Sequence, residues 1–155
     1  MFDPLLPPGL HHYWKADFVN HLTDEIIAEH VRHGPDIPTI NSALHIYPVD
    51  GAVHDVAPRD TAFAYRRARF THIIAAVSPD PTAMPRYREW VRNYWSALHP
   101  HSSGGAYVNF LMDDEGDDRI AASFQENYGR LAQVKKMYDP GNLFRVNQNI
   151  RPAAA

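Results

Sequence analysis

The sequence has no cysteine among its 155 residues, so no disulfide can stabilise the fold and no thiolate can bind a metal. The lack of disulfides fits a reducing compartment. No stretch approaches the roughly 20 apolar residues needed to span a membrane, and the N-terminus lacks the basic start and continuous apolar core of a signal peptide. We therefore expect a cytoplasmic protein with no membrane partner.

A strong excess of one charge is also lacking, since 15 basic and 18 acidic residues give a formal net charge of -3. The basic pairs Arg66-Arg67 and Lys135-Lys136 are too short for a nucleic-acid footprint, so we expect solvated surface there and no nucleic-acid partner. Ten histidines occur without any cysteine or H-E-x-x-H motif, so the sequence predicts no metal site. Length and composition are typical of one globular domain.

The sequence also lacks the glycines of a phosphate-binding loop. The eight glycines include no glycine-rich run and no G-x-G-x-x-G, so no dinucleotide-binding turn is recognisable. The acidic segment 113–118 lacks the alternating spacing of a calcium loop, which predicts a solvated turn.

Short apolar runs bounded by turn residues indicate strands. Two of them flank Asp50-Gly51, a dipeptide suited to a tight hairpin turn, and Pro48 puts this hairpin near a sheet edge. The run at residues 69–77 is apolar on both faces at its end, which predicts a central strand. The predicted strands cover residues 13–20, 43–47, 52–56, 69–77 and 105–111.

Three stretches have helical signals. Thr23 is predicted to be the N-cap of a helix that ends before Gly34-Pro35. A second helix starts near Pro85 and carries one apolar stripe, expected to pack in the core: Tyr87, Trp90, Val91, Tyr94, Trp95 and Leu98. Residues 120–138 continue a helical pattern across Gly129, so one long helix and two shorter ones both stay open. Together the elements predict an α+β fold, an antiparallel β-sheet of about four or five strands flanked by helices.

Within residues 105–111, strand alternation would put Tyr107, Asn109 and Leu111 on one face. One interpretation is a half-buried strand whose polar groups find ordinary hydrogen-bond partners. The other is a ligand-facing pair, since a phenol can give or take a proton and an amide can donate and accept at once.

The motifs that follow favour the second interpretation. They are Y-x-N at 107–109, E-N-Y-x-R-L-x-x-V-K at 126–135 and Y-D-P-x-N-L-F-R-x-N-Q-N-I-x-P at 138–152. This series resembles the C-terminal end of the berberine-bridge-enzyme-like FAD-linked oxidases, which are flavoenzymes of the vanillyl-alcohol-oxidase type. Upstream, residues 5–15 and 44–53 also look like the substrate domain of that family.

The resemblance implies one domain over residues 1–155. Residues 1–103 would be its substrate-domain-like part and residues 104–152 its berberine-bridge-type C-terminal motif. The family's N-terminal FAD-binding domain, with its glycine-rich pyrophosphate loop, has no counterpart in the sequence.

By the same resemblance, Tyr107 is the catalytic base, which takes the proton of a substrate hydroxyl while hydride passes to the flavin N5. A phenol is a weak acid, so a neighbouring cation or oriented donor would have to stabilise the phenolate. Asn109 would face the flavin ring edge or the substrate, and Lys15 would line the substrate site. A set of C-terminal amides would contact the flavin or form only a docked tail: Asn147, Gln148 and Asn149.

The activity implied is FAD-dependent oxidation of an alcohol-bearing small molecule, such as a carbohydrate or secondary metabolite. Where the family often shows His-Arg, this sequence has Tyr65-Arg66, so no substrate-pocket role follows for Tyr65. Two alternatives stay open: a non-catalytic remnant or binding module, which would expose an apolar patch or form a homodimer to cover it, and one half of a split oxidase that needs a separate flavin-binding domain.

Overall fold

The computed structural model describes residues 7–146 and 148–154. Its sheet has three antiparallel strands in the order β1-β3-β2, namely β1 (His11–Val19), β3 (Phe70–Ser78) and β2 (Ala43–Pro48). This confirms the predicted α+β fold and the central position of the strand predicted at residues 69–77. Three strands are fewer than the four or five expected. Of the helices described, none combines the length and apolarity that a membrane crossing requires.

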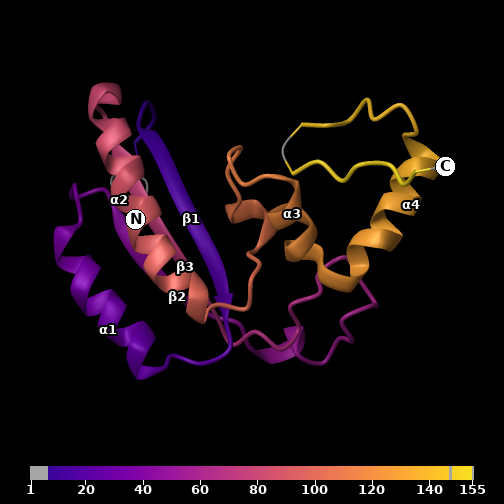
Figure 1. Ribbon diagram of the computed structural model, residues 1–155, viewed down its shortest axis with the longest axis horizontal. Helices are drawn as coiled ribbons and strands as arrows, with labels where there is room; N and C mark the ends of the chain where they lie inside the picture. The colour runs from indigo at the N-terminus through magenta and orange to yellow at the C-terminus, as the bar shows by residue number, and fades with distance from the viewer. Residues whose placement is uncertain (1–6, 147, 155) are drawn as a thin grey trace.

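Two helices, α1 (Asp24–His33) and α2 (Met84–Leu98), cover one face of the sheet (Figure 1). Thr23 accepts a hydrogen bond from the backbone N–H of Ile26, which confirms the predicted N-cap. The apolar stripe of α2 packs into the main core as expected, with Val91, Tyr94 and Leu98 fully or almost fully buried.

The C-terminal third lies on the opposite face of the sheet (Figure 1). It contributes α3 (Asp117–Phe124) and α4 (Tyr128–Tyr138), which are separated by a 3-10 turn at Gln125–Asn127. Gln125 takes a left-handed conformation with φ 49°, so the helical pattern breaks into two helices, one of the two alternatives left open. Ala106, Leu111 and Ile120 pack here against Ala16 and Ile73 of the sheet.

The predicted strand at residues 105–111 is wrong. The backbone of Gly105 accepts a hydrogen bond from the Phe18 N–H at 2.8 Å, but the chain then turns through a short 3-10 helix at Val108–Phe110. Residues 105–111 thus touch the end of β1 without continuing the sheet.

The predicted hairpin around Asp50-Gly51 is also wrong. Gly51 does take a left-handed φ of +64°, but it opens a 3-10 turn, Gly51–Val53, instead of a second strand. β2 pairs with β3 instead, with Leu44 opposite Ile74. Pro48 ends β2, as expected for a residue that has no N–H to continue the ladder.

Candidate functional site

The segment that carries Tyr107 is fixed to the end of β1. Phe18 donates its N–H to Gly105 and accepts from the Ser103 N–H, both at 2.8 Å. The Ala106 N–H donates to the hydroxyl of Ser123 on α3 at 3.2 Å. These bonds hold the backbone just before Tyr107 between the sheet and α3.

Tyr107 and Asn109 come together, as expected, but through a turn and not through strand alternation. The Asn109 Nδ2 donates to the Tyr107 hydroxyl oxygen at 2.9 Å. The Tyr107 ring meets the rings of Phe110 and Phe63 edge-on, with centroids 5.3 and 6.4 Å apart. Because Tyr107 stays 38% exposed, its phenol is both oriented and accessible.

Tyr107 lines an open hollow of about 440 Å³ on the sheet face opposite α1 and α2. We call it the tyrosine hollow. Its other lining residues are mostly apolar or aromatic: Phe18, Val49, Val53, Phe63, Arg66 and Thr71. An apolar hollow with a few convergent polar groups is the usual form of a small-molecule site.

A second open hollow, of about 510 Å³, adjoins Asn109 and is also lined by Leu111, Val146 and Gln148. The Gln148 side-chain amide donates to the Leu111 carbonyl at 2.6 Å. The buried Asn149 Oδ1 has no hydrogen-bond partner among the described residues. Asn147 lies outside the described residues.

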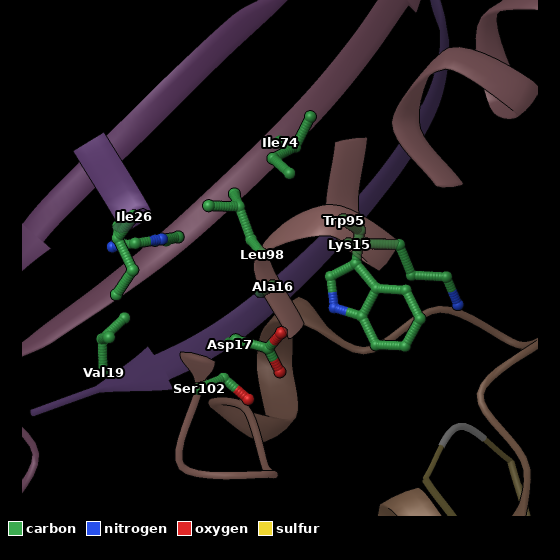
Figure 2. A pocket seen from close by; sticks show the side chains of 10 residues that line it. Lys15, Ala16, Asp17, Val19, Ile26, Ile74, Trp95, Leu98 and Ser102 are labelled. Carbon is green, nitrogen blue, oxygen red and sulfur yellow. The ribbon is translucent and has the colours of Figure 1, made fainter. Parts of the chain in front are cut away.

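Lys15 does not line the tyrosine hollow. It is 5% exposed, and its Nζ lies 2.8 Å from Asp114 Oδ1 and 3.0 Å from Glu115 Oε1. Burial opposes its charge, but these two carboxylates raise the pKa of Lys15 above its ordinary value. Figure 2 shows Lys15 beside Trp95, whose ring centre lies 5.8 Å from the Nζ. A role of Lys15 in substrate binding stays a prediction.

The prediction that the acidic segment is a solvated turn is wrong for Glu115, whereas Asp114 lies at an exposed turn position and forms ion pairs there. The Glu115 side chain is 1% exposed and pairs with Arg119 at 2.7 Å. Asp114 accepts hydrogen bonds from Tyr13, Arg92 and Lys15 at 2.7 to 2.8 Å. Although burial opposes it, these donors hold the pKa of Asp114 well below its usual range.

Tyr65 is buried and packs within the fold. Its hydroxyl donates to the Ala122 carbonyl at 2.9 Å and its ring stacks on Phe18 at 4.5 Å. Burial raises the pKa of its hydroxyl. Tyr65 lies outside the tyrosine hollow and lines a different open hollow, together with Asn20 and Gln125.

Of the residues that line the tyrosine hollow, the sequence predicted only Tyr107 as a site residue, and Arg66 and Phe63 are among those that it did not predict. Arg66 is only partly exposed, so the prediction of solvated surface fails for it although it holds for Arg67. The sequence signal that could have indicated them is the order of residues in 61–66, where a basic residue, Arg66, follows the aromatic residues Phe63 and Tyr65.

The fold and the hollow define a class: an α+β unit with a three-stranded antiparallel sheet, which presents a tyrosine beside an open hollow on one sheet face. Solved structures share this fold. A glycopeptide hexose oxidase complexed with teicoplanin matches with a TM-score of 0.83 and 25% identity, over 93% of this chain and 33% of that one. A berberine-bridge-enzyme-like protein from Arabidopsis thaliana matches with a TM-score of 0.81 and 23% identity, over 94% and 34%.

Residues 106–151 match the family model described as berberine and berberine like. An FAD-linked oxidoreductase of Dictyostelium discoideum is 25% identical over 98% of this chain and 33% of its own length. Another FAD-linked oxidoreductase, from Bacillus subtilis, is 32% identical over 74% and 25%. Residues 106–151 thus carry a berberine-like domain, and the chain is similar to FAD-linked oxidoreductases of which it spans a quarter to a third of the length.

These relatives imply FAD as the cofactor, and the amides beside the second hollow fit part of it. Gln148 and Asn109 line the second hollow, and the buried Asn149 Oδ1 is an acceptor without a partner within the described part of the chain. Amide side chains both donate and accept, which suits the carbonyl and ring-nitrogen edge of a flavin. Asn109 and Gln148 therefore bring amide groups of the kind that such an edge requires to the second hollow.

Proposed function

We propose that this chain supplies the substrate side of an FAD-dependent oxidoreductase that oxidises an alcohol-bearing small molecule. The observation that carries the proposal is the hydrogen bond from Asn109 Nδ2 to the Tyr107 hydroxyl oxygen, at the mouth of an open apolar hollow. The berberine-like domain over residues 106–151 supports it.

In this proposal Tyr107 takes the proton of the substrate hydroxyl. The amide N–H of Asn109 points at the oxygen on which negative charge develops, and a hydrogen bond to a charged acceptor is stronger than one to a neutral acceptor. Bound FAD supplies the hydride acceptor, and the protein supplies position and a base. The exposed edge of Tyr107 leaves room for a substrate to reach the phenol oxygen.

The substrate class follows from the relatives only in outline. The relatives include a glycopeptide hexose oxidase and a tetrahydroberberine oxidase from Berberis wilsoniae, so the group includes enzymes named for a sugar and for an alkaloid. We propose a carbohydrate or secondary metabolite for this chain. In the proposal Gln148, Asn149 and Asn147 contact the flavin, and Lys15 supports the substrate side.

The test is a titration of the purified chain with FAD, followed by quenching of flavin fluorescence. We expect saturable binding that weakens several-fold in Asn149→Ala, because the unpaired buried acceptor is lost. Asn93→Ala is the control, since Asn93 is exposed on α2 across the sheet. No quenching up to high micromolar FAD would refute flavin binding by this chain alone.

A split or two-part oxidase is the second candidate, and exposed apolar side chains favour it. Three apolar side chains near the C-terminus are each at least 77% exposed: Leu143, Phe144 and Val146. Val146 also lines the second hollow. Such a surface marks an interaction site. Sedimentation of the chain alone and with a flavin-binding domain of a relative would separate a homodimer, a monomer and a two-part complex.

A further inference from the structure

Arg66 is held in a fixed position at the tyrosine hollow by neutral groups. Its Nε donates to the Phe63 carbonyl at 3.1 Å, its Nη1 to the Val53 carbonyl at 3.2 Å and its Nη2 to the Thr61 hydroxyl at 2.5 Å. The guanidinium also lies 4.9 Å from the centre of the Phe63 ring. Among the described residues no carboxylate pairs with it, so a rigidly placed positive charge stays uncompensated.

Arg66 also lines a neighbouring hollow of about 540 Å³, which we call the arginine hollow. Arg67 and Arg69 line it too, and their exposed side chains make no hydrogen bond or ion pair within residues 7–146 and 148–154. Asp50 is the single acidic residue of this lining, and it forms no ion pair with the three arginines. Val49 and Arg66 belong to both hollows, so the two adjoin.

We propose that the two hollows bind one substrate, which carries its alcohol at Tyr107 and an anionic group, a carboxylate, at Arg66 and the arginine hollow. The position of the alcohol rests on the proposed function. A planar guanidinium with free N–H groups is suited to paired hydrogen bonds with a carboxylate. Aromatic residues beside it, Phe63 and Phe18, suit an apolar body between the two polar ends.

The test compares two probes of the same shape, 4-(hydroxymethyl)benzoate and 4-(hydroxymethyl)benzamide. Each is titrated into the ¹⁵N-labelled chain, and the shifts of the backbone amide signals of Val49, Val53 and Phe63, which line the tyrosine hollow, are followed in the wild type and in each variant. We expect the carboxylate to bind on the order of tenfold more tightly than the amide, with a difference that shrinks as salt is added. Arg66→Gln should abolish the difference.

Arg130→Gln is the matched control, because Arg130 also donates to a backbone carbonyl but lines neither hollow. If Arg66→Gln fails to fold, the paired change Arg67→Gln with Arg69→Gln alters only exposed side chains and should still lower the preference several-fold. Equal binding of the two probes, or a preference that survives in these variants, would overturn the proposal.

A cofactor phosphate is the competing anion, and ADP tests it. If ADP displaces the benzoate probe and its binding is lost in Arg66→Gln, the arginine hollow holds phosphates and the substrate assignment is wrong. The probe assay needs no flavin, so its failure leaves the FAD titration with Asn149→Ala as an independent test of the proposed function.

Discussion

Lowering the pH from 7 to 4 should destabilise the fold through one buried histidine. His72 on β3 is 3% exposed, and its Nε2 has no hydrogen-bond partner among the described residues. The ring of His30 lies 4.8 Å away. Burial, with a smaller contribution from His30, lowers the pKa of His72 from 6.5 to about 4.

The sign follows from proton linkage. Above pH 6.5 His72 is neutral in both the folded and the unfolded chain, so it adds no pH dependence. Between pH 6.5 and 4 the unfolded chain binds a proton that the folded chain excludes, so the free energy of unfolding falls as the pH falls. A difference from 6.5 to about 4, at roughly 1.4 kcal/mol per pH unit, gives a loss of about 3 kcal/mol.

Urea unfolding followed by tryptophan fluorescence at pH 7, 6, 5 and 4 measures this loss. Other groups also titrate, so the quantity of interest is the difference between the wild type and His72→Gln, which removes the buried imidazole. We expect the wild type to lose about 3 kcal/mol more than His72→Gln over this range, and His21→Gln, at an exposed position, to behave as the wild type. If the wild type and His72→Gln lose equal stability, the reasoning is refuted.

Three further predictions use the same unfolding assay or the complete enzyme. Lys15→Met should cost about 3 to 5 kcal/mol, because it removes one of the two cations that pair with the buried Glu115 carboxylate, whereas Arg151→Gln, in an exposed ion pair, should cost under about 1 kcal/mol. Gly105→Ala should cost about 1 to 3 kcal/mol, because the new Cβ would overlap the Tyr65 hydroxyl, and Tyr65→Phe in that background should restore part of the loss. With its flavin domain supplied, Tyr107→Phe should lower kcat by about 10² to 10⁴-fold with FAD binding unchanged, and a kcat within a factor of about three would contradict the role of the phenol as base.

The elements that could be predicted are those whose signals are local. Thr23 caps its helix within three residues, and the stripe through Val91, Tyr94 and Leu98 repeats with the helical period, so both are visible in the sequence. Strand partners are not local. Residues 105–111 alternate like a strand, yet only Gly105 bonds to β1 before the backbone turns at Val108–Phe110.

The same limit applies to the site. The sequence places Tyr107 and Asn109 two residues apart, which is enough to predict that they act together, and the turn brings their side chains to 2.9 Å. Arg66 reaches the same hollow from 41 positions earlier in the chain. The fixed position of the Arg66 guanidinium depends on three neutral acceptors, and two of them, Val53 and Thr61, lie outside any sequence motif. From the sequence alone, the pair Arg66-Arg67 therefore could not be distinguished from solvated surface.

Buried charged side chains connect the fold to the site, because they join the segment that carries Tyr107 to the sheet. Arg119 on α3 bonds to Asp17 of β1 at 2.9 Å and to Glu115 at 2.7 Å, and Glu115 in turn pairs with Lys15 of β1. Residues 104–111 lie between these anchors, so the network fixes where the Tyr107 phenol stands relative to the sheet face. Opening the network in Lys15→Met should therefore loosen the Tyr107 and Asn109 pair even though Lys15 touches neither residue, which side-chain NMR of Asn109 Nδ2 would detect as a lost hydrogen bond.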